Sequence, residues 1–311
     1  MQSPIPPERS TSQPAPLRLS GGLATELMRA GVAVRAPLWG TEALRTAQGR
    51  QLLRGVYADF LTAGAQVVAA NTFRANLRAL RRVGLDEAGA ADVVREAVEL
   101  ARAAVSGRAV RVVGSIAPVE DCYRPDLVPS DAELRAEHGW LAEQLVSAGV
   151  DFVLCETMNT AREARIALEQ VLAAGGRAWV SVVCGDGARL LSGEKLADVG
   201  AAVVRDGAEA VLVNCTPLAQ TELCLRQLRA HLPGLIGAYP NLEERSNLLA
   251  WTPVEDLLPV AVEPEAFAAI VHRWWIELSI DVVGGCCGTT PRHLSALSRQ
   301  LTHGCAPTSR S

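Results

Sequence analysis

Two adjacent cysteines, Cys286 and Cys287, stand in the glycine-rich stretch GGCCGT near the end of the sequence, and a third, Cys215, stands in the stretch NCT. Three thiolates are a good ligand set for Zn²⁺, because zinc favours soft sulfur donors in a tetrahedral arrangement. With three protein ligands the fourth position stays open for substrate, which is typical of catalytic zinc. We therefore expect a zinc site if the fold brings Cys215 to the cysteine pair.

The glycines before the pair fit this prediction. Gly284 and Gly285 permit the sharp turn and close backbone approach that direct two successive side chains at one ion. Other interpretations stay open from the residues alone. The two cysteines could be small buried hydrophobes, and a vicinal disulfide is a weaker alternative. A glycine-rich loop after the last strand of a barrel could also hold phosphate, which would leave both cysteines without a role.

A repeating pattern predicts the elements that must position these residues. Short β-branched runs alternate with longer segments of helical period, and the alternation occurs eight times. The runs are residues 17–20, 66–72, 110–115, 151–156, 178–184, 210–215, 235–240 and 280–284. Eight strand–helix units predict an α/β fold, a single (β/α)8 TIM barrel, with an open doubly wound sheet as the alternative.

The predicted barrel also predicts where chemistry occurs, because active sites in this fold lie at the C-terminal ends of the strands. Cys215 ends the sixth run, and Cys286 and Cys287 follow the eighth, so the three thiols should meet at one face of the barrel. The other polar or small residues at strand ends include Ser20, Gly21, Gly22, Asn71, Ser115 and Glu156. The long connection at 241–263 is a candidate cover for this face.

Composition limits the function classes. The 311 residues carry a formal net charge of -4 and no basic face interleaved with aromatics, so a small-molecule partner is expected rather than a nucleic acid. No apolar run approaches the length of a membrane span. Residues 1–16, rich in Pro and Ser, and residues 304–311 are predicted to be disordered tails around a domain at 17–303. The cysteines do not resemble a secreted disulfide framework, which favours the cytoplasm.

Five stretches together resemble a known family. SGGLATEL, VLCET, VLVNCT, GAYPN and GGCCGTTPRH occur in this order between Leu17 and Leu301, and they are similar to stretches of the zinc-dependent homocysteine S-methyltransferase family. Members of that family are (β/α)8 barrels that methylate the thiol of homocysteine to give methionine. The resemblance implies that Cys215, Cys286 and Cys287 are the zinc ligands.

The same resemblance implies a substrate site. Glu156 matches the family's glutamate that binds the homocysteine ammonium, and Asn71 and Ser115 are predicted hydrogen-bonding partners, with capping roles as the alternative. Ser20, Gly21 and Gly22 complete the predicted substrate contacts. Most relatives carry Asp in place of Ser20, so a charge-assisted hydrogen bond of roughly 1.5–3 kcal/mol is missing, and a different thiol acceptor stays possible.

The methyl donor is inferred from the same resemblance. The chain lacks the C-terminal extension of the betaine-using branch and the further domains of cobalamin-dependent methionine synthases, which implies the compact branch that uses S-methylmethionine or S-adenosylmethionine. Aromatic faces that could stabilise a sulfonium belong to Trp39, Phe73, Tyr123 and Trp251. The alternatives are a methyl-corrinoid or folate donor, and a noncatalytic zinc-binding barrel. The oligomeric state is not predicted.

Other residues that could carry chemistry receive structural interpretations. Cys122, Cys184, Cys224 and Cys305 have no partner at ligand spacing, and Cys155 is expected to be a small hydrophobe inside a strand. His293 is expected on the last helix, at a surface or capping position rather than as a ligand.

Overall fold

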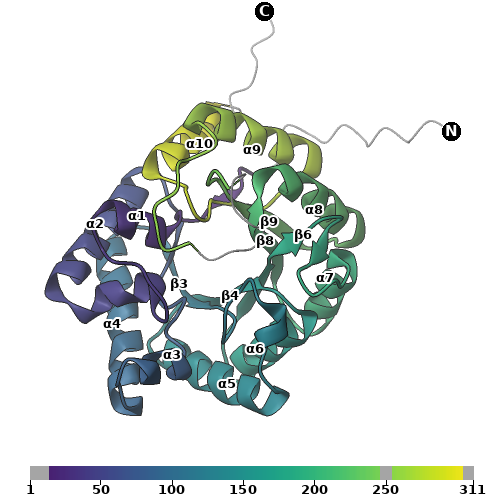
Figure 1. Cartoon of the computed structure of the whole chain (residues 1–311). Coiled ribbons are helices and arrows are strands. Elements are labelled where there is room, and N and C mark those ends of the chain that lie inside the picture. The colour runs from purple at the N-terminus through teal and green to yellow at the C-terminus, as the bar shows by residue number, and fades with distance from the viewer. Residues whose placement is uncertain (1–13, 246–253, 304–311) are drawn as a thin grey trace, which may run out of the picture.

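A barrel of parallel strands forms the centre of the molecule, and helices surround it (Figure 1). The computed structural model describes residues 14–245 and 254–303. The barrel strands are β1 (Leu17–Arg18), β2 (Val67–Ala69), β3 (Arg111–Ile116), β4 (Phe152–Met158), β5 (Ala178–Val182), β8 (Ala210–Pro217), β9 (Leu235–Asn241) and β10 (Val282–Val283).

The sheet closes on itself. Its order is β1-β10-β9-β8-β5-β4-β3-β2, with every neighbouring pair parallel. A parallel bridge between Leu19 and Val67 joins the first and last strands of this order, and Ser20 N donates to Val67 O at 2.8 Å. The (β/α)8 barrel predicted from the alternation, including all eight strand positions, is confirmed.

The outer ring consists of helices that follow the strands in sequence. They are α1 (Leu23–Arg29), α2 (Ala47–Thr62), α3 (Leu77–Arg82), α4 (Glu87–Val105), α5 (Asp131–Ser147), α6 (Ala161–Ala173), α7 (Leu196–Arg205), α8 (Leu218–His231), α9 (Pro264–Leu278) and α10 (Pro291–His303). Two short 3₁₀ helices are η1 (Trp39–Arg45) and η2 (Pro125–Leu127). In several helices the side chain of the N-cap residue accepts a hydrogen bond from a backbone N–H of the first turn, which stabilises the helix by about 1 kcal/mol. These N-cap residues are Thr46, Asn76, Asp86, Ser130 and Thr160.

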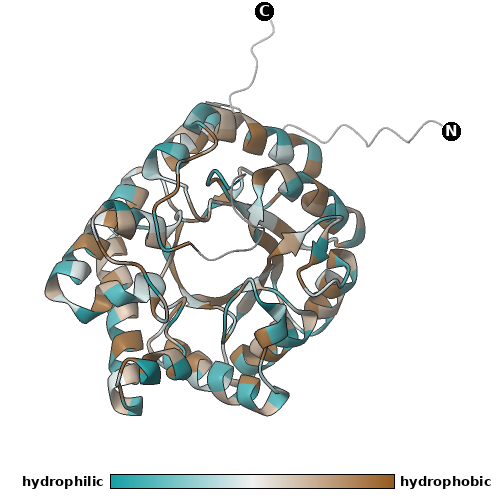
Figure 2. Cartoon of the chain, in the orientation of Figure 1, coloured by the Kyte–Doolittle hydropathy of each residue, from teal (hydrophilic) through white to brown (hydrophobic). Residues whose placement is uncertain are grey.

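Alternation along the strands divides the core into two layers. On β4, Phe152 and Leu154 point into the barrel, where the Phe152 ring lies 4.2 Å from that of Trp179. Val153 and Cys155 point outward and pack against the helices, which confirms Cys155 as a small buried hydrophobe. The strands are accordingly hydrophobic along much of their length (Figure 2). The barrel interior is thus filled, and the space for a ligand lies above it.

Three features lie outside the regular repeat. A two-stranded hairpin, β6 (Cys184–Gly185) with β7 (Arg189–Leu190), follows β5 and was not predicted. The connection at 241–263 contains an antiparallel bridge between Glu243 and Val260, and its residues 246–253 lie outside the described residues. Of the predicted tails, residues 1–13 and 304–311 lie outside the described residues, whereas residues 14–16 are described, with Pro16 buried. No helix in the described ranges is long and apolar enough to cross a membrane.

Candidate metal centre and substrate cavity

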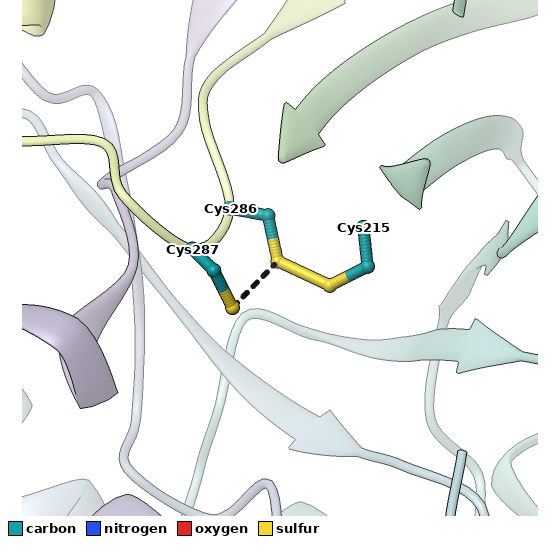
Figure 3. Close-up of side chains that lie close together, drawn as sticks. All are labelled: Cys215, Cys286 and Cys287. Carbon is teal, nitrogen blue, oxygen red and sulfur yellow. Dashed lines mark hydrogen bonds between the residues drawn. A yellow bond between two sulfur atoms is a disulfide. The ribbon is translucent and has the colours of Figure 1, made fainter. Parts of the chain in front are cut away.

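Three cysteine sulfur atoms converge at the C-terminal face of the barrel, as predicted (Figure 3). Cys215 lies in β8, and Cys286 and Cys287 lie in the loop after β10. The three Sγ atoms lie within 4.8 Å of one another. Cys215 and Cys286 are joined as a disulfide, with Cα atoms 5.6 Å apart, and Cys287 is free, with its Sγ 4.0 Å from that of Cys286. The disulfide therefore pairs different cysteines from the vicinal alternative.

The end of β8 directs Cys215 toward the pair. Cys215 has a φ of 51°, in the left-handed region, at a register shift between Asn214 and Pro217. Asn214 is fully buried; its Nδ2 donates to Thr157 Oγ1 at 2.7 Å, and its Oδ1 accepts from Ser181 Oγ at 2.7 Å. These bonds tie β8, at the residue just before the irregularity, to β4 and β5. The backbone at a functional position is thus held in a conformation that few L residues adopt.

Glycines leave room for the loop that carries the pair. A Cβ on Gly285 would lie 1.9 Å from Thr289 Oγ1, and one on Gly284 would lie 2.8 Å from Leu19 Cβ. Backbone hydrogen bonds fix the loop, because Cys286 N donates to Pro240 O at 2.8 Å and Leu242 N donates to Cys287 O at 2.9 Å. The requirement for small residues before the cysteines is therefore confirmed.

The donor set fits Zn²⁺. Tetrahedral ligands at about 2.3 Å from zinc place neighbouring sulfur atoms about 3.8 Å apart, within the spread of the three Sγ positions. Burial, and then the Glu243 carboxylate, raise the pKa of the Cys287 thiol. A cation at the centre opposes both effects by stabilising the thiolate. Because a sulfur in a disulfide cannot act as a thiolate ligand, the metal site requires Cys215 and Cys286 to be reduced.

A cavity of about 200 Å³ opens beside the sulfur atoms. Its lining contains most of the residues predicted from the strand ends: Ser20, Gly21, Gly22, Asn71, Ser115, Glu156, Cys215, Cys286 and Cys287. Trp39, Phe73 and Tyr123 also line it, whereas Trp251 lies outside the described residues. The structure therefore brings the predicted substrate contacts together around one space, and their contact with substrate stays a prediction.

Glu156 is the buried carboxylate of this cavity. Its Oε1 accepts from Ser115 Oγ and its Oε2 accepts from the Tyr239 hydroxyl at 3.2 Å. Burial raises the pKa of Glu156, and the hydrogen bonds from the two hydroxyls partly offset the increase. Among the described residues no cation forms an ion pair with it. A carboxylate in this situation is a favourable partner for a substrate ammonium.

Several predicted residues also have structural contacts. Asn71 Nδ2 donates to Gly40 O at 2.7 Å, so Asn71 anchors η1 to β2. A Cβ on Gly22 would lie 2.5 Å from Cys286 O, and one on Gly21 would lie 2.6 Å from the Phe60 ring. Ser20 is buried and offers a hydroxyl but no charge. The first motif thus makes room for the cysteine loop at the edge of the cavity.

The structure corrects one prediction and adds residues. His293 is 3% exposed, so the surface position was wrong; its Nδ1 accepts from Thr290 N at 3.2 Å, which agrees with the capping role. The polar residues that line the cavity but were not predicted as site residues include Arg74, Asp121, Cys122, Tyr239, Glu243 and Arg245. Arg74 and Tyr239 occur in the stretches ANTFRAN and GAYPN, but nothing in either stretch signals a buried contact.

Known proteins resemble this chain over nearly its whole length. The chain is 29% identical to Homocysteine S-methyltransferase of Escherichia coli strain K12, covering 90% of this chain and 94% of that protein. It is 26% identical to Selenocysteine Se-methyltransferase of Brassica oleracea var. italica, covering 91% and 88%. The crystal structure of the E. coli homocysteine methyltransferase MmuM in its metallated form superposes with a TM-score of 0.78 at 28% identity, covering 92% of this chain and 96% of that one.

The sequence model described as Homocysteine S-methyltransferase matches residues 17–301. This range contains the whole barrel, the three cysteines and Glu156. Membership of an enzyme family disfavours both the phosphate-binding interpretation and the noncatalytic one. With its (β/α)8 barrel, its cysteine cluster of zinc-binding type and this match, the chain belongs to the homocysteine S-methyltransferase family of methyltransferases.

Proposed function

We propose that this protein transfers a methyl group from a sulfonium donor, S-methylmethionine or S-adenosylmethionine, to the thiol of homocysteine, giving methionine. The observation that carries the proposal is the convergence of three cysteine sulfurs and the buried Glu156 on one cavity. The cysteine cluster suits a thiol, and the Glu156 carboxylate suits an ammonium. Homocysteine carries both groups, four bonds apart.

The reaction needs a deprotonated thiol and a positioned donor. When bound, Zn²⁺ supplies the positive charge that keeps the substrate sulfur in its thiolate form. Cys215, Cys286 and Cys287 would hold the ion, and Glu156 would fix the amino end of the acceptor. A lone pair of the acceptor sulfur forms the new bond to the methyl carbon, while the electron pair of the breaking bond stays on the donor sulfur. The donor leaves as a neutral thioether, and the thiol proton goes to solvent.

The cavity lining favours a sulfonium donor. Trp39, Phe73 and Tyr123 line the cavity with aromatic rings, which attract a cation. The Arg74 guanidinium lies 5.5 Å from the Phe73 ring centroid and that of Arg245 lies 5.9 Å from the Tyr123 ring centroid, so Trp39 is the candidate face for the sulfonium. The Ser115 and Tyr239 hydroxyls bind Glu156. The cavity is also small, about 200 Å³, which suits a free amino-acid donor better than a methyl-corrinoid group. Holding both sulfur atoms in line supplies most of the remaining rate enhancement.

A second acceptor class is a selenol or another thiol. Ser20 adds no carboxylate to the cavity, so recognition of the acceptor ammonium depends on fewer charges. One relative named above is a selenocysteine methyltransferase. Cytoplasmic location is also proposed, because reducing conditions keep Cys215 and Cys286 available as thiolates.

Methyl transfer can be tested directly. Reduced, zinc-loaded protein is incubated with homocysteine and methyl-deuterated S-methylmethionine, or in parallel with methyl-deuterated S-adenosylmethionine, and labelled methionine is measured by mass spectrometry. We expect label in methionine from at least one donor. Selenocysteine as acceptor in a third reaction separates the two acceptor classes. Absence of label from all reactions, with one zinc per chain, contradicts the proposal.

A further inference from the structure

Arg74 is a buried cation at the wall of the substrate cavity. It lies after β2, is 6% exposed, and lines the same cavity as the cysteine cluster. Among the described residues it forms no ion pair. The carboxylate of Glu120, whose backbone oxygen accepts from Arg74, pairs instead with Arg78 at 3.1 Å and Arg82 at 2.8 Å. A buried guanidinium without a counter-charge is unfavourable, so a partner for it is expected from outside the chain.

The contacts of Arg74 leave this charge uncompensated. Its Nη1 donates to Pro118 O at 2.9 Å and to Glu120 O, both neutral carbonyls. Its Nε is buried and has no hydrogen-bond partner in the described part of the chain. A guanidinium has five N–H donors in a planar fork that matches a carboxylate. The guanidinium also lies 5.5 Å from the centroid of the Phe73 ring, a cation–π contact. The loop and this ring therefore hold the side chain in place, while no carboxylate pairs with its charge and its Nε has no partner in the described part of the chain.

Glu156 is the complement of Arg74 in the same cavity. Its two hydrogen bonds come from hydroxyls, so its negative charge also has no opposite charge beside it. Of the other charged residues that line the cavity, Glu243 and Arg245 lie 2.8 Å apart and compensate each other. Asp121 accepts from Tyr123 N at 2.8 Å and, in the described part of the chain, forms no ion pair with Arg74. The Cys122 thiol lines the same cavity as both charges. Burial raises the pKa of this thiol most, while Arg74 lowers that pKa and Glu156 raises it.

We propose that Arg74 binds the carboxylate of an amino-acid substrate, so that the cavity recognises a zwitterion with its ammonium at Glu156 and its carboxylate at Arg74. The inference rests on the proposed function and deepens it, because it assigns the residue that selects amino acids over simple amines. The carboxylate belongs to the acceptor or to the donor, since both are amino acids. The experiment below separates these two sources.

The test compares ligands that differ only in the carboxylate. Methionine and 3-(methylthio)propylamine represent the acceptor side, and S-methylmethionine and (3-aminopropyl)dimethylsulfonium represent the donor side. Their dissociation constants are measured by calorimetry for the wild type and Arg74→Gln. We expect Arg74→Gln to weaken the acid of one pair by about tenfold or more while its amine changes by less than about twofold. The pair that responds identifies the substrate that Arg74 binds.

Matched variants separate this role from support of the loop. Arg74→Lys keeps the charge but loses the planar fork, so the preference for the acid should fall only in part. Asn159→Ala removes the hydrogen bonds to Asp121 O and Cys122 O, at 3.3 Å and 3.1 Å, and loosens the same loop without removing a charge. The acid-to-amine ratio should be unchanged in Asn159→Ala.

Three outcomes overturn the assignment. The acid-to-amine ratio is the same in Arg74→Gln and wild type for both pairs, or Asn159→Ala abolishes the ratio equally, or wild-type protein binds neither acid more tightly than its amine. All three are equilibrium measurements, so they are independent of methyl transfer. Failure of the proposed function appears instead as absence of labelled methionine from the wild type.

Discussion

Two walls of the same cavity are built by different means. The sulfur wall consists of Cys215, Cys286 and Cys287, and the polar wall consists of Arg74 and Glu156. Backbone geometry builds the sulfur wall through a left-handed residue, glycines without room for a Cβ, and backbone hydrogen bonds. Side chains build the polar wall through hydrogen bonds that cross between elements. We therefore expect substitutions that add volume to disturb the sulfur wall most. Substitutions that remove polar atoms should disturb the polar wall most.

The loop at 117–123 shows how the polar wall is held. Buried side chains bind its backbone from three directions: Asn76 Nδ2 donates to Val119 O at 3.2 Å, Asn159 Nδ2 donates to Cys122 O at 3.1 Å, and Glu163 Oε1 accepts from Val119 N at 2.8 Å. Each of these groups would cost free energy if left without its partner. The loop therefore keeps one position although it has little regular structure.

The largest expected effect comes from breaking the sulfur wall. Cys287→Ala removes one of three ligands, so we expect loss of bound zinc and a decrease in methyl transfer of roughly 10³-fold or more, because thiol activation is lost. The melting temperature of the metal-free protein should change little, since the site lies on loops above the core. Metal analysis and circular dichroism measure these two effects.

Cys122→Ala is the matched control, because Cys122 lines the same cavity without belonging to the cluster. It should retain one zinc per chain. Zinc bound equally by Cys287→Ala and the wild type would remove the basis for assigning the sulfur wall as the metal centre.

The polar wall should respond through substrate affinity rather than metal content. Glu156→Gln keeps the shape but removes the charge, and we expect the KM for homocysteine to rise about 10- to 100-fold with zinc retained. Ser115→Ala should have a smaller effect in the same direction, because it removes one bond to the carboxylate and not the charge. A Glu156→Gln variant that loses zinc instead would show that the two walls are not separable.

The pH dependence sharpens this prediction. Burial raises the pKa of Glu156, so the carboxylate ionises above its ordinary range and the KM for homocysteine should fall as pH rises through that pKa. Folding stability has the opposite trend. At pH values between the ordinary and the raised pKa, Glu156 binds more protons in the folded state than in the unfolded state. The contribution of Glu156 to the free energy of unfolding therefore decreases as pH rises. Glu156→Gln should remove both dependences, which kinetics and unfolding curves across pH can measure.

Added volume tests the backbone geometry of the sulfur wall. Gly285→Ala places a Cβ 1.9 Å from Thr289 Oγ1, so we expect destabilisation of about 1–3 kcal/mol and weaker zinc binding. Gly55→Ala, in the exposed part of α2, has no atom within 4 Å of the new Cβ and should stabilise the protein by about 0.5–1 kcal/mol. Denaturant unfolding and zinc titration check both variants. Equal effects would contradict the steric account.

The two walls also differ in how far the sequence predicted them. The sulfur wall was predictable because GGCC is a rare local pattern and because counting the strands places Cys215 beside it. Counting the strands also places Glu156 at this face, but its role as the partner of the acceptor ammonium was predicted only through the family resemblance. The burial of Arg74 was not predictable, since its partners Pro118 and Glu120 lie more than forty residues away and contribute backbone oxygens, which no side-chain pattern reveals. The β6–β7 hairpin is likewise too short to give a periodic signal.

Substitution of His293 tests whether the stability of the structure that follows the sulfur wall in the chain depends on pH. Its Nε2 lies 2.8 Å from Val262 O, which can only accept, so Nε2 carries the proton and Nδ1 is free to accept from Thr290 Oγ1 at 2.8 Å. The neutral ring satisfies both contacts, and burial lowers the pKa of His293. Below pH about 6.5 the unfolded histidine therefore binds a proton that the folded one excludes. Stability from this group is complete above that pH and is lost as pH falls toward the lowered pKa.

His293→Gln keeps a donor and an acceptor at this position but cannot titrate. We expect it to cost about 1 kcal/mol at pH 8, where the histidine contacts are intact, and less at pH 5.5, where the wild type has lost part of its own stability. Unfolding free energies at the two pH values measure the difference. If the cost of the substitution is the same at both, protonation of His293 does not couple to folding, and the sulfur wall depends on backbone geometry alone.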